Sequence, residues 1–296
     1  MGETVFIPRT GEIIENVVVI KTEESEEKKK RYKKNMEKRK DLYEVINNNC
    51  GNFYFYKYDK VLDVLQDDTA TGFRFLYLCA CAEPDGRIIA YKNKYCKTIG
   101  DFTYVFEKTI DTVKKYLDKI LKNNLISKTD GEYIINSEYF ATNLSDKEFR
   151  GNSVRIFNDA IKELYRNSDY KEHSLLGQLV KLIPYTNVHS NIICWNIQDK
   201  DVTKIQPFTH QEIQHILQPK NNYGYELLNK LETILIKDEL VIGRFEAGKE
   251  EHYKINPRLF YRGNDPKALT SLIQSFDLST HQYKERVKRK KMTKGV

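Results

Sequence analysis

The chain has 296 residues, of which 40% are hydrophobic and 31% charged, and its formal net charge is +7. This length is typical of about two domains of roughly 100–200 residues each, and the hydrophobic content excludes a chain that is disordered throughout. No stretch approaches the ~18 apolar residues of a membrane span and the N-terminus lacks the pattern of a signal peptide, so we expect a soluble, cytoplasmic protein.

Residues 1–70 are predicted to form an N-terminal extension. The apolar alternation of Ile13–Ile20 is typical of a strand or hairpin. Residues 21–40 begin acidic and become strongly basic, with almost no apolar side chain. Such a run is typical of either a solvated helix or a flexible basic arm.

The first predicted domain spans residues 71–152. Its pattern predicts a helix over 73–83, a short strand over 87–91, helices over 99–106 and 110–122, and a hairpin that begins near residue 125. In the helix over 110–122, Ile110, Val113, Leu117, Ile120 and Leu121 are expected to form one apolar face.

The second predicted domain, residues 153–265, repeats this order. Helices are predicted over 173–185, 208–218 and 223–237, with a strand between the first two and a hairpin after the third. Thr209 and Glu212 have the spacing of a capping box. Residues 266–296 are predicted to form a C-terminal helix and a basic tail, because seven Lys or Arg and one Glu lie between residues 284 and 294.

A short motif marks the same point of both domains. Residues 133–140 read YIINSEYF and residues 253–260 read YKINPRLF, and each is followed by an echo, FRGN from Phe149 and YRGN from Tyr261. We expect Asn136 and Asn256 to end a strand, and Gly151 and Gly263 to adopt a positive φ. The repeat indicates two copies of one supersecondary design.

Helix, strand, helix, helix and hairpin is the order of the winged helix-turn-helix, whose second turn-linked helix can enter the DNA major groove. The predicted fold class is therefore α+β, mainly α, with two tandem winged helix-turn-helix domains acting on double-stranded DNA as an internal pseudo-dimer. Polar and basic side chains of the two reading helices, the hairpins and the tail are the candidate DNA contacts. They are Thr109, Asp111, Thr112, Lys114, Lys115, Lys119, Lys122, Lys128, Asn221, Asn222, Tyr223, Tyr225, Asn229, Lys230, Arg244, Lys249, Lys288, Arg289, Lys290 and Lys291.

A protein-binding role is the alternative, because winged helices also dock proteins. The chain would then be an adaptor for replication or transcription machinery. A continuous positive face that includes Lys115 and Lys230 favours DNA, and an acidic face around Glu226 and Glu232 favours the adaptor.

Motifs for catalysis are absent from the sequence. There is no phosphate-binding G-x-x-x-x-G-K-[ST] loop, no H-E-x-x-H pair and no G-x-S-x-G elbow. The five cysteines include no C-x-x-C pair. We therefore expect a protein that is not an enzyme, with no catalytic residue, metal or cofactor.

The second domain resembles the winged-helix replication proteins of Gram-positive plasmids and phages, the RepL type. The resemblance covers roughly residues 174–264 and rests on KLIPYTNVHSNIICWN, KIQPFTHQEIQHIL and YKINPRLFYRGN. It implies double-stranded DNA binding for replication initiation or for regulation of transcription. The first domain carries only a degraded form of these motifs.

Overall fold

A computed structural model describes residues 3–7, 12–17, 23–65, 68–142, 153–217, 224–247 and 250–294. The chain separates into two compact units, residues 1–43 and residues 44–296. The fold is α+β and mainly helical, as predicted. Its strands form small antiparallel sheets.

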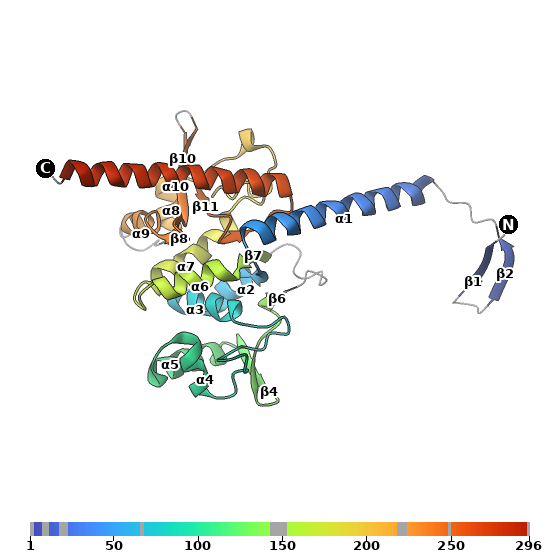
Figure 1. The fold of residues 1–296 in the computed structure, drawn as a ribbon, viewed down its shortest axis with the longest axis horizontal. Helices are drawn as coiled ribbons and strands as arrows, with labels where there is room; N and C mark the ends of the chain where they lie inside the picture. The colour runs from blue at the N-terminus through green and yellow to red at the C-terminus, as the bar shows by residue number, and fades with distance from the viewer. Residues whose placement is uncertain are drawn as a thin grey trace. The chain divides into compact units, whose positions relative to one another are not determined.

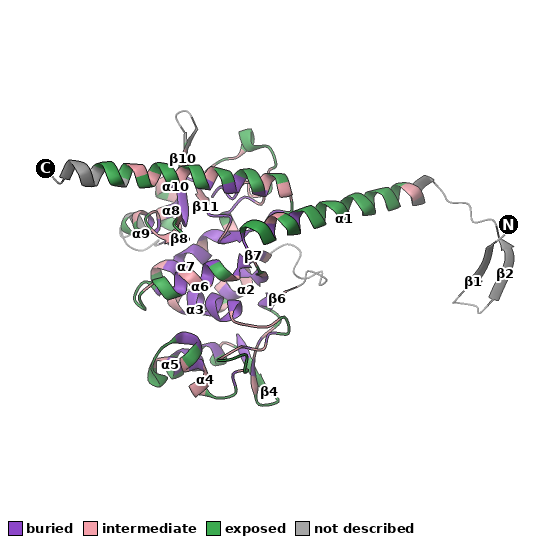
Figure 2. Ribbon diagram, in the orientation of Figure 1, coloured by how far each residue is buried: buried purple, intermediate pink, exposed green. Residues whose placement is uncertain are grey.

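The first unit contains a hairpin and most of a long helix. Strands β1 (Glu3–Ile7) and β2 (Glu12–Val17) pair antiparallel, which confirms the predicted strand or hairpin. Helix α1 (Glu23–Asn49) is exposed at every residue from 27 to 41, as the green ribbon in Figure 2 shows. Of the two predicted forms of the charged segment, the solvated helix is the one present.

A four-stranded sheet joins the two halves of the second unit, in the order β12, β7, β3 and β6. Strands β3 (Phe53–Lys57) and β7 (Ser153–Phe157) pair antiparallel at its centre. Strand β6 (Phe140–Ala141) lies outside β3, and β12 (Phe260–Tyr261) lies outside β7. Each half therefore contributes one inner and one outer strand.

Within the described residues, the two halves share an order of strand, four helices, hairpin and outer strand, and the second half adds two 3-10 helices and the β8–β9 hairpin. The first half continues from β3 through α2 (Tyr58–Leu65), α3 (Thr69–Ala80), α4 (Ile99–Phe106), α5 (Ile110–Lys122), β4 (Ile126–Thr129) and β5 (Glu132–Ile135). The second continues from β7 through α6 (Asn158–Asn167), α7 (His173–Leu182), η2 (Ile183–Tyr185), η3 (Val202–Lys204), α8 (His210–Leu217), α9 (Gly224–Leu231), β8 (Leu235–Ile236), β9 (Glu239–Leu240), β10 (Ile242–Ala247) and β11 (Glu250–Ile255). Helix α10 (Pro266–Lys294) follows β12.

The sheet register relates the halves by a local two-fold axis. Phe55 faces Arg155 at the centre of the β3–β7 pair. Ala141 of β6 faces Phe55, and Tyr261 of β12 faces Arg155. An antiparallel pair is symmetric about its central residues, so Ala141 and Tyr261 occupy equivalent positions. The sequence echo had instead aligned Tyr261 with Phe149, which lies outside the described residues.

The repeated motif forms the turn that follows each hairpin. The backbone N–H of Asn136 donates to Leu125 O, and that of Asn256 donates to Val241 O. Each Asn side-chain oxygen also accepts the N–H two residues later, at 2.9 Å in the first half and 2.8 Å in the second. Strands β5 and β11 end one residue before these Asn, which confirms their predicted place.

The prediction of a positive φ at Gly263 is wrong. Gly263 is not among the described residues with positive φ. Gly151 lies outside the described residues. Space is what requires glycine at position 263: a Cβ there would lie 2.2 Å from the Tyr261 hydroxyl and 2.6 Å from Val188 O. The constraint is therefore packing, not backbone conformation.

Three further expectations need correction. The predicted helix over 223–237 ends at Leu231, because residues 235–240 form the β8–β9 hairpin around a turn with positive φ at Lys237 and Asp238. The basic run near the C-terminus continues helix α10 and is not a separate tail within the described residues. Strand β3 and helix α2, assigned to the N-terminal extension, belong to the sheet unit. The other predicted domain boundaries remain predictions.

Helices α3 and α7 pack against each other in the core. Every residue of α3 except Ala70 is buried. The Asp68 side chain caps its first turn by accepting the Thr71 N–H at 3.1 Å. The Tyr77 ring stacks on the Tyr165 ring of α6 with 3.7 Å between ring centroids, so α3 contacts α6 as well as α7.

A buried histidine of this core is neutral. Arg74 Nε donates to His173 Nδ1 at 3.1 Å, so this nitrogen carries no proton. Burial and the nearby Arg74 charge lower the pKa of His173 to about 4. In an unfolded chain its pKa is about 6.5, so the unfolded state binds more protons between these two values.

The first prediction concerns acid stability. The contribution of neutral His173 is complete above its unfolded pKa and is lost as the pH falls toward the folded pKa. We expect the free energy of unfolding to fall between about pH 7 and 5, and we expect His173→Gln, which retains an acceptor for Arg74, to reduce this slope. Urea unfolding at several pH values measures it, with exposed His281→Gln as the matched control. Equal slopes in the wild type and the His173→Gln variant would contradict the assignment.

Candidate nucleic-acid interface

Local sequence signals explain the arrangement of α4, α5 and the hairpin after them. Thr98 and Asp101 form a capping box at the start of α4, and Glu107, in the left-handed region, ends it. Thr109 then starts α5 without a side-chain cap. The predicted helix bounds, 99–106 and 110–122, are those observed.

The buried face of α5 differs in part from the predicted one. Val113, Leu117 and Ile120 are buried as expected. Ile110 is 55% exposed and Leu121 37% exposed, which corrects their assignment to the apolar face. Tyr116, which was not assigned to that face, is buried beside the Phe106 ring of α4. An aromatic residue thus completes the contact between the two helices.

The outer face of α5 carries the predicted polar residues. Asp111, Lys114, Lys115 and Lys122 are exposed, and none of these three lysines makes an ion pair with another described residue. The hydroxyls of Thr109 and Thr112 lie 3.1 Å apart at the start of the helix.

Lys119 has a structural partner that the sequence did not indicate. Its Nζ lies 2.6 Å from Asp68 Oδ2, so it pairs with the residue that caps α3. Burial alone would raise the pKa of Asp68, but the hydrogen bonds from Lys119 and Thr71 outweigh burial and lower it. Because Lys119 already pairs with Asp68 at the start of α3, it is a weaker candidate for a phosphate contact than Lys115 and Lys122 of the same helix.

The hairpin β4–β5 projects beside this helix. Asp130 and Gly131 both have positive φ, as a tight hairpin turn requires. Lys128 is exposed on β4, with its Nζ 5.0 Å from the centre of the Tyr133 ring. A cation near the hairpin is in keeping with a contact to phosphate.

The second half, which contains α8 and α9, has fewer of the predicted DNA contacts within the described residues. The predicted capping box is present: Thr209 N–H donates to Glu212 Oε2 at 2.6 Å, and Glu212 N–H donates to Thr209 Oγ1 at 3.3 Å. On α9, Lys230 is exposed and Asn229 half-buried. Four predicted contacts lie outside the described residues or their side chains: Asn221, Asn222, Tyr223 and Tyr225.

The charges near the second hairpin partly cancel. Arg244 of β10 forms an ion pair with Glu251 of β11. Glu226 is exposed on α9, whereas Glu232 is half-buried and burial raises its pKa. Lys249 lies outside the described residues. This face therefore offers less free positive charge than α5 does.

Helix α10 packs by its first half and extends by its second. Leu269, Leu272, Ile273 and Phe276 are buried. Lys288 and Arg289 are exposed, and the side chains of Lys290 and Lys291 are outside the description. The long basic end is visible in Figure 1 as the red helix that runs to the C-terminus.

Comparison with known proteins gives no relative. No family model, no curated protein and no solved structure matches the chain. Among the described residues, no helix is long and apolar enough to cross a membrane, and no group of three or more His, Cys, Asp or Glu is placed to hold a metal ion.

Proposed function

We propose that residues 69–135 and 173–255 are two winged-helix modules and that the protein binds double-stranded DNA with both. In each, the segment after the first helix pairs with the last hairpin strand, through Arg87 with Ile134 and through Ile192 with Lys254. Two helices linked by a short connection lie between the paired segments. This order and pairing support the winged-helix interpretation.

The exposed face of α5 carries the DNA hypothesis. Lys114, Lys115 and Lys122 present three positive charges without an ion-pair partner in the described structure. Lysines on the outer face of the second helix of such a pair are suited to phosphate contacts beside the major groove. Base reading would come from the start of the helix, where Thr109 and Thr112 lie.

The symmetry of the sheet supports an inverted arrangement of half-sites. Two modules related by a local two-fold axis present their reading helices in opposite directions. The DNA site would then be an imperfect inverted repeat, because α5 and α9 differ in sequence. The resemblance to RepL-type proteins favours a cytoplasmic role in plasmid or phage replication initiation or in transcription regulation.

A protein-docking role for the second module is the other candidate. Glu226 is exposed on α9 and Arg244 is neutralised by Glu251. A face with little free positive charge suits a protein partner better than phosphate. In this form, the first module would hold DNA while the second held a replication or transcription protein.

The second prediction tests DNA binding directly. We expect the protein to bind a fluorescent random duplex in the micromolar range or tighter and to lose affinity steeply between about 50 and 200 mM salt. Fluorescence anisotropy at the two salt concentrations measures the effect. Absence of binding to any duplex at the lower salt concentration would reject the proposal and favour protein docking.

A further inference from the structure

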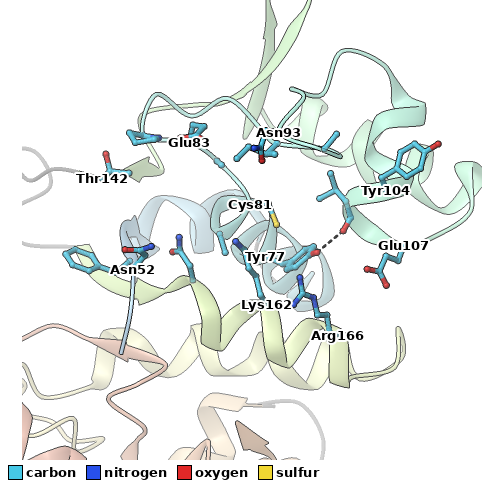
Figure 3. Close-up of a pocket in the computed structure, with 18 residues that line it drawn as sticks. Asn52, Tyr77, Cys81, Glu83, Asn93, Tyr104, Glu107, Thr142, Lys162 and Arg166 are labelled. Atoms are coloured by element: carbon cyan, nitrogen blue, oxygen red, sulfur yellow. Dashed lines mark hydrogen bonds between the residues drawn. The ribbon is translucent and has the colours of Figure 1, made fainter. Parts of the chain in front are cut away.

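A polar pocket lies between the first module and helix α6. Its volume is about 710 Å³, within the range of about 300–1,000 Å³ typical of small-molecule sites. It is bordered by the C-terminal end of α3, the loop after it, the end of α4 and one face of α6. Figure 3 shows Lys162 and Arg166 on α6 at one side, with Asn93 and Tyr104 across from them.

The two-fold relation of the halves explains why this pocket is open. Thr142 borders it and directly follows Ala141, whereas the equivalent position after Tyr261 is Arg262. In the second half the Arg262 guanidinium occupies the corresponding place, donating to Thr186 O at 3.0 Å and to the Tyr58 hydroxyl at 2.9 Å. Threonine is too short to fill the same volume in the first half.

The charge of the pocket wall also differs between the two halves. Asn158, Lys162 and Arg166 are four residues apart along α6 and form one stripe that faces the pocket. The equivalent helix α2 carries Tyr58 and Leu62 where α6 carries Asn158 and Lys162. The face of α2 that contacts Arg262 is therefore neutral at these two positions, whereas the equivalent face of α6 is basic.

The polar groups on the α6 wall of the pocket have no partners within the described structure. Lys162 and Arg166 make no ion pair or hydrogen bond with other described residues. Their positive charges are therefore available to an anion that enters the pocket.

We propose that this pocket binds a small phosphorylated ligand of nucleotide size. Lys162 and Arg166 hold its phosphate. The carboxylates of Glu83 and Glu107, at other points of the lining, accept from hydroxyl or amino groups. Inorganic phosphate would leave most of the volume empty, whereas a nucleotide offers both the anion and the donors.

A rim of aromatic rings provides a surface for a planar base. Tyr104 borders the pocket and stacks on Tyr91, with 5.7 Å between the ring centroids. Both rings are more than half exposed, at 63% and 56%. Aromatic faces accept nucleobases by stacking, which contributes about 1–3 kcal/mol per base. The tyrosine pair therefore supplies the apolar surface that the charged wall lacks.

The third prediction is the test of this site. Isothermal titration calorimetry of the full chain with ATP, ADP, AMP and inorganic phosphate is expected to give a Kd below about 1 mM for at least one nucleotide. Lys162→Gln with Arg166→Gln is expected to weaken that binding at least about 10-fold. Thr142→Arg, which introduces the side chain that fills the other half, is expected to abolish it.

The matched control removes the same charge from exposed positions outside the pocket. Lys200→Gln with Lys267→Gln is expected to leave nucleotide binding unchanged, because these lysines do not border the pocket. The site would be rejected by failure of every nucleotide to bind below about 1 mM, or by equal affinity in the wild type and the Lys162/Arg166 variant. Phosphate binding as tight as that of any nucleotide would reject the nucleotide assignment. DNA binding enters none of these outcomes.

Discussion

Replacement of Gly177 by alanine is expected to destabilise the protein strongly. Gly177 lies in α7 where this helix crosses the start of α3, and a Cβ there would lie 1.9 Å from Thr69 O and 2.5 Å from Thr69 C. These are backbone atoms, which cannot rotate away. Thr69 is further fixed because its hydroxyl donates to Ser174 O at 2.9 Å. Relief of the overlap requires the two helices to separate.

The expected loss is about 1–3 kcal/mol or more in the free energy of unfolding, as in other overpacked cores. The helix propensity of alanine opposes this loss, because glycine in a helix costs about 1 kcal/mol relative to alanine. Urea unfolding followed by circular dichroism measures the difference. A lower urea midpoint with unchanged slope would show a loss of stability alone.

Gly72 provides the matched control on the partner helix. It also lies within a helix, α3, but a Cβ added there would have Leu65 Cδ1 as its nearest neighbour at 3.8 Å, an ordinary contact. Gly72→Ala is therefore expected to stabilise the protein by about 0.5–1 kcal/mol. Opposite signs for the two substitutions would confirm the close helix crossing, and an equal or higher urea midpoint for Gly177→Ala than for the wild type would contradict it.

Local patterns predicted the elements better than their partners. The bounds of α4 and α5 follow from a capping box and from apolar residues at helical spacing, both of which are local signals. The β3–β7 pair joins segments 100 residues apart, such as Phe55 and Arg155. The sequence of neither segment indicates that it pairs with the other. The symmetry of the halves therefore emerged only with the sheet register.

The two candidate sites differ in the same way. The lysines of α5 were predicted because they lie opposite an apolar face on one helix. The partnership of Lys119 with Asp68 was missed, because it links residues 51 positions apart. The pocket stripe of Asn158, Lys162 and Arg166 looks like any solvated helix face in the sequence. The four-residue spacing indicates that the three side chains share one helix face. That this face borders a pocket depends on the short side chain of Thr142, which only the structure places there.

Removal of the unpaired positive charges of α5 is expected to cause the largest loss of DNA affinity. Lys114→Gln, Lys115→Gln and Lys122→Gln together remove three exposed cations and leave the buried face and the Lys119–Asp68 pair intact. If each lysine contacts one phosphate, the slope of log K against log salt should fall in magnitude by about 3, and affinity at low salt should fall on the order of 100-fold. Anisotropy titrations of one duplex over a range of salt concentrations measure both quantities.

The control must separate the position of the charges from their number. Lys171, Lys200 and Lys267 are exposed, and their replacement by glutamine lowers the net charge by the same amount. A general attraction between a basic protein and DNA would weaken equally in both triple variants, because it depends on total charge. If the protein binds DNA through α5, the slope of log K against log salt will decrease in magnitude only in the Lys114/Lys115/Lys122 variant. Equal losses would show that α5 is not the contact, and the second module and the basic end of α10 would then be the remaining described candidates.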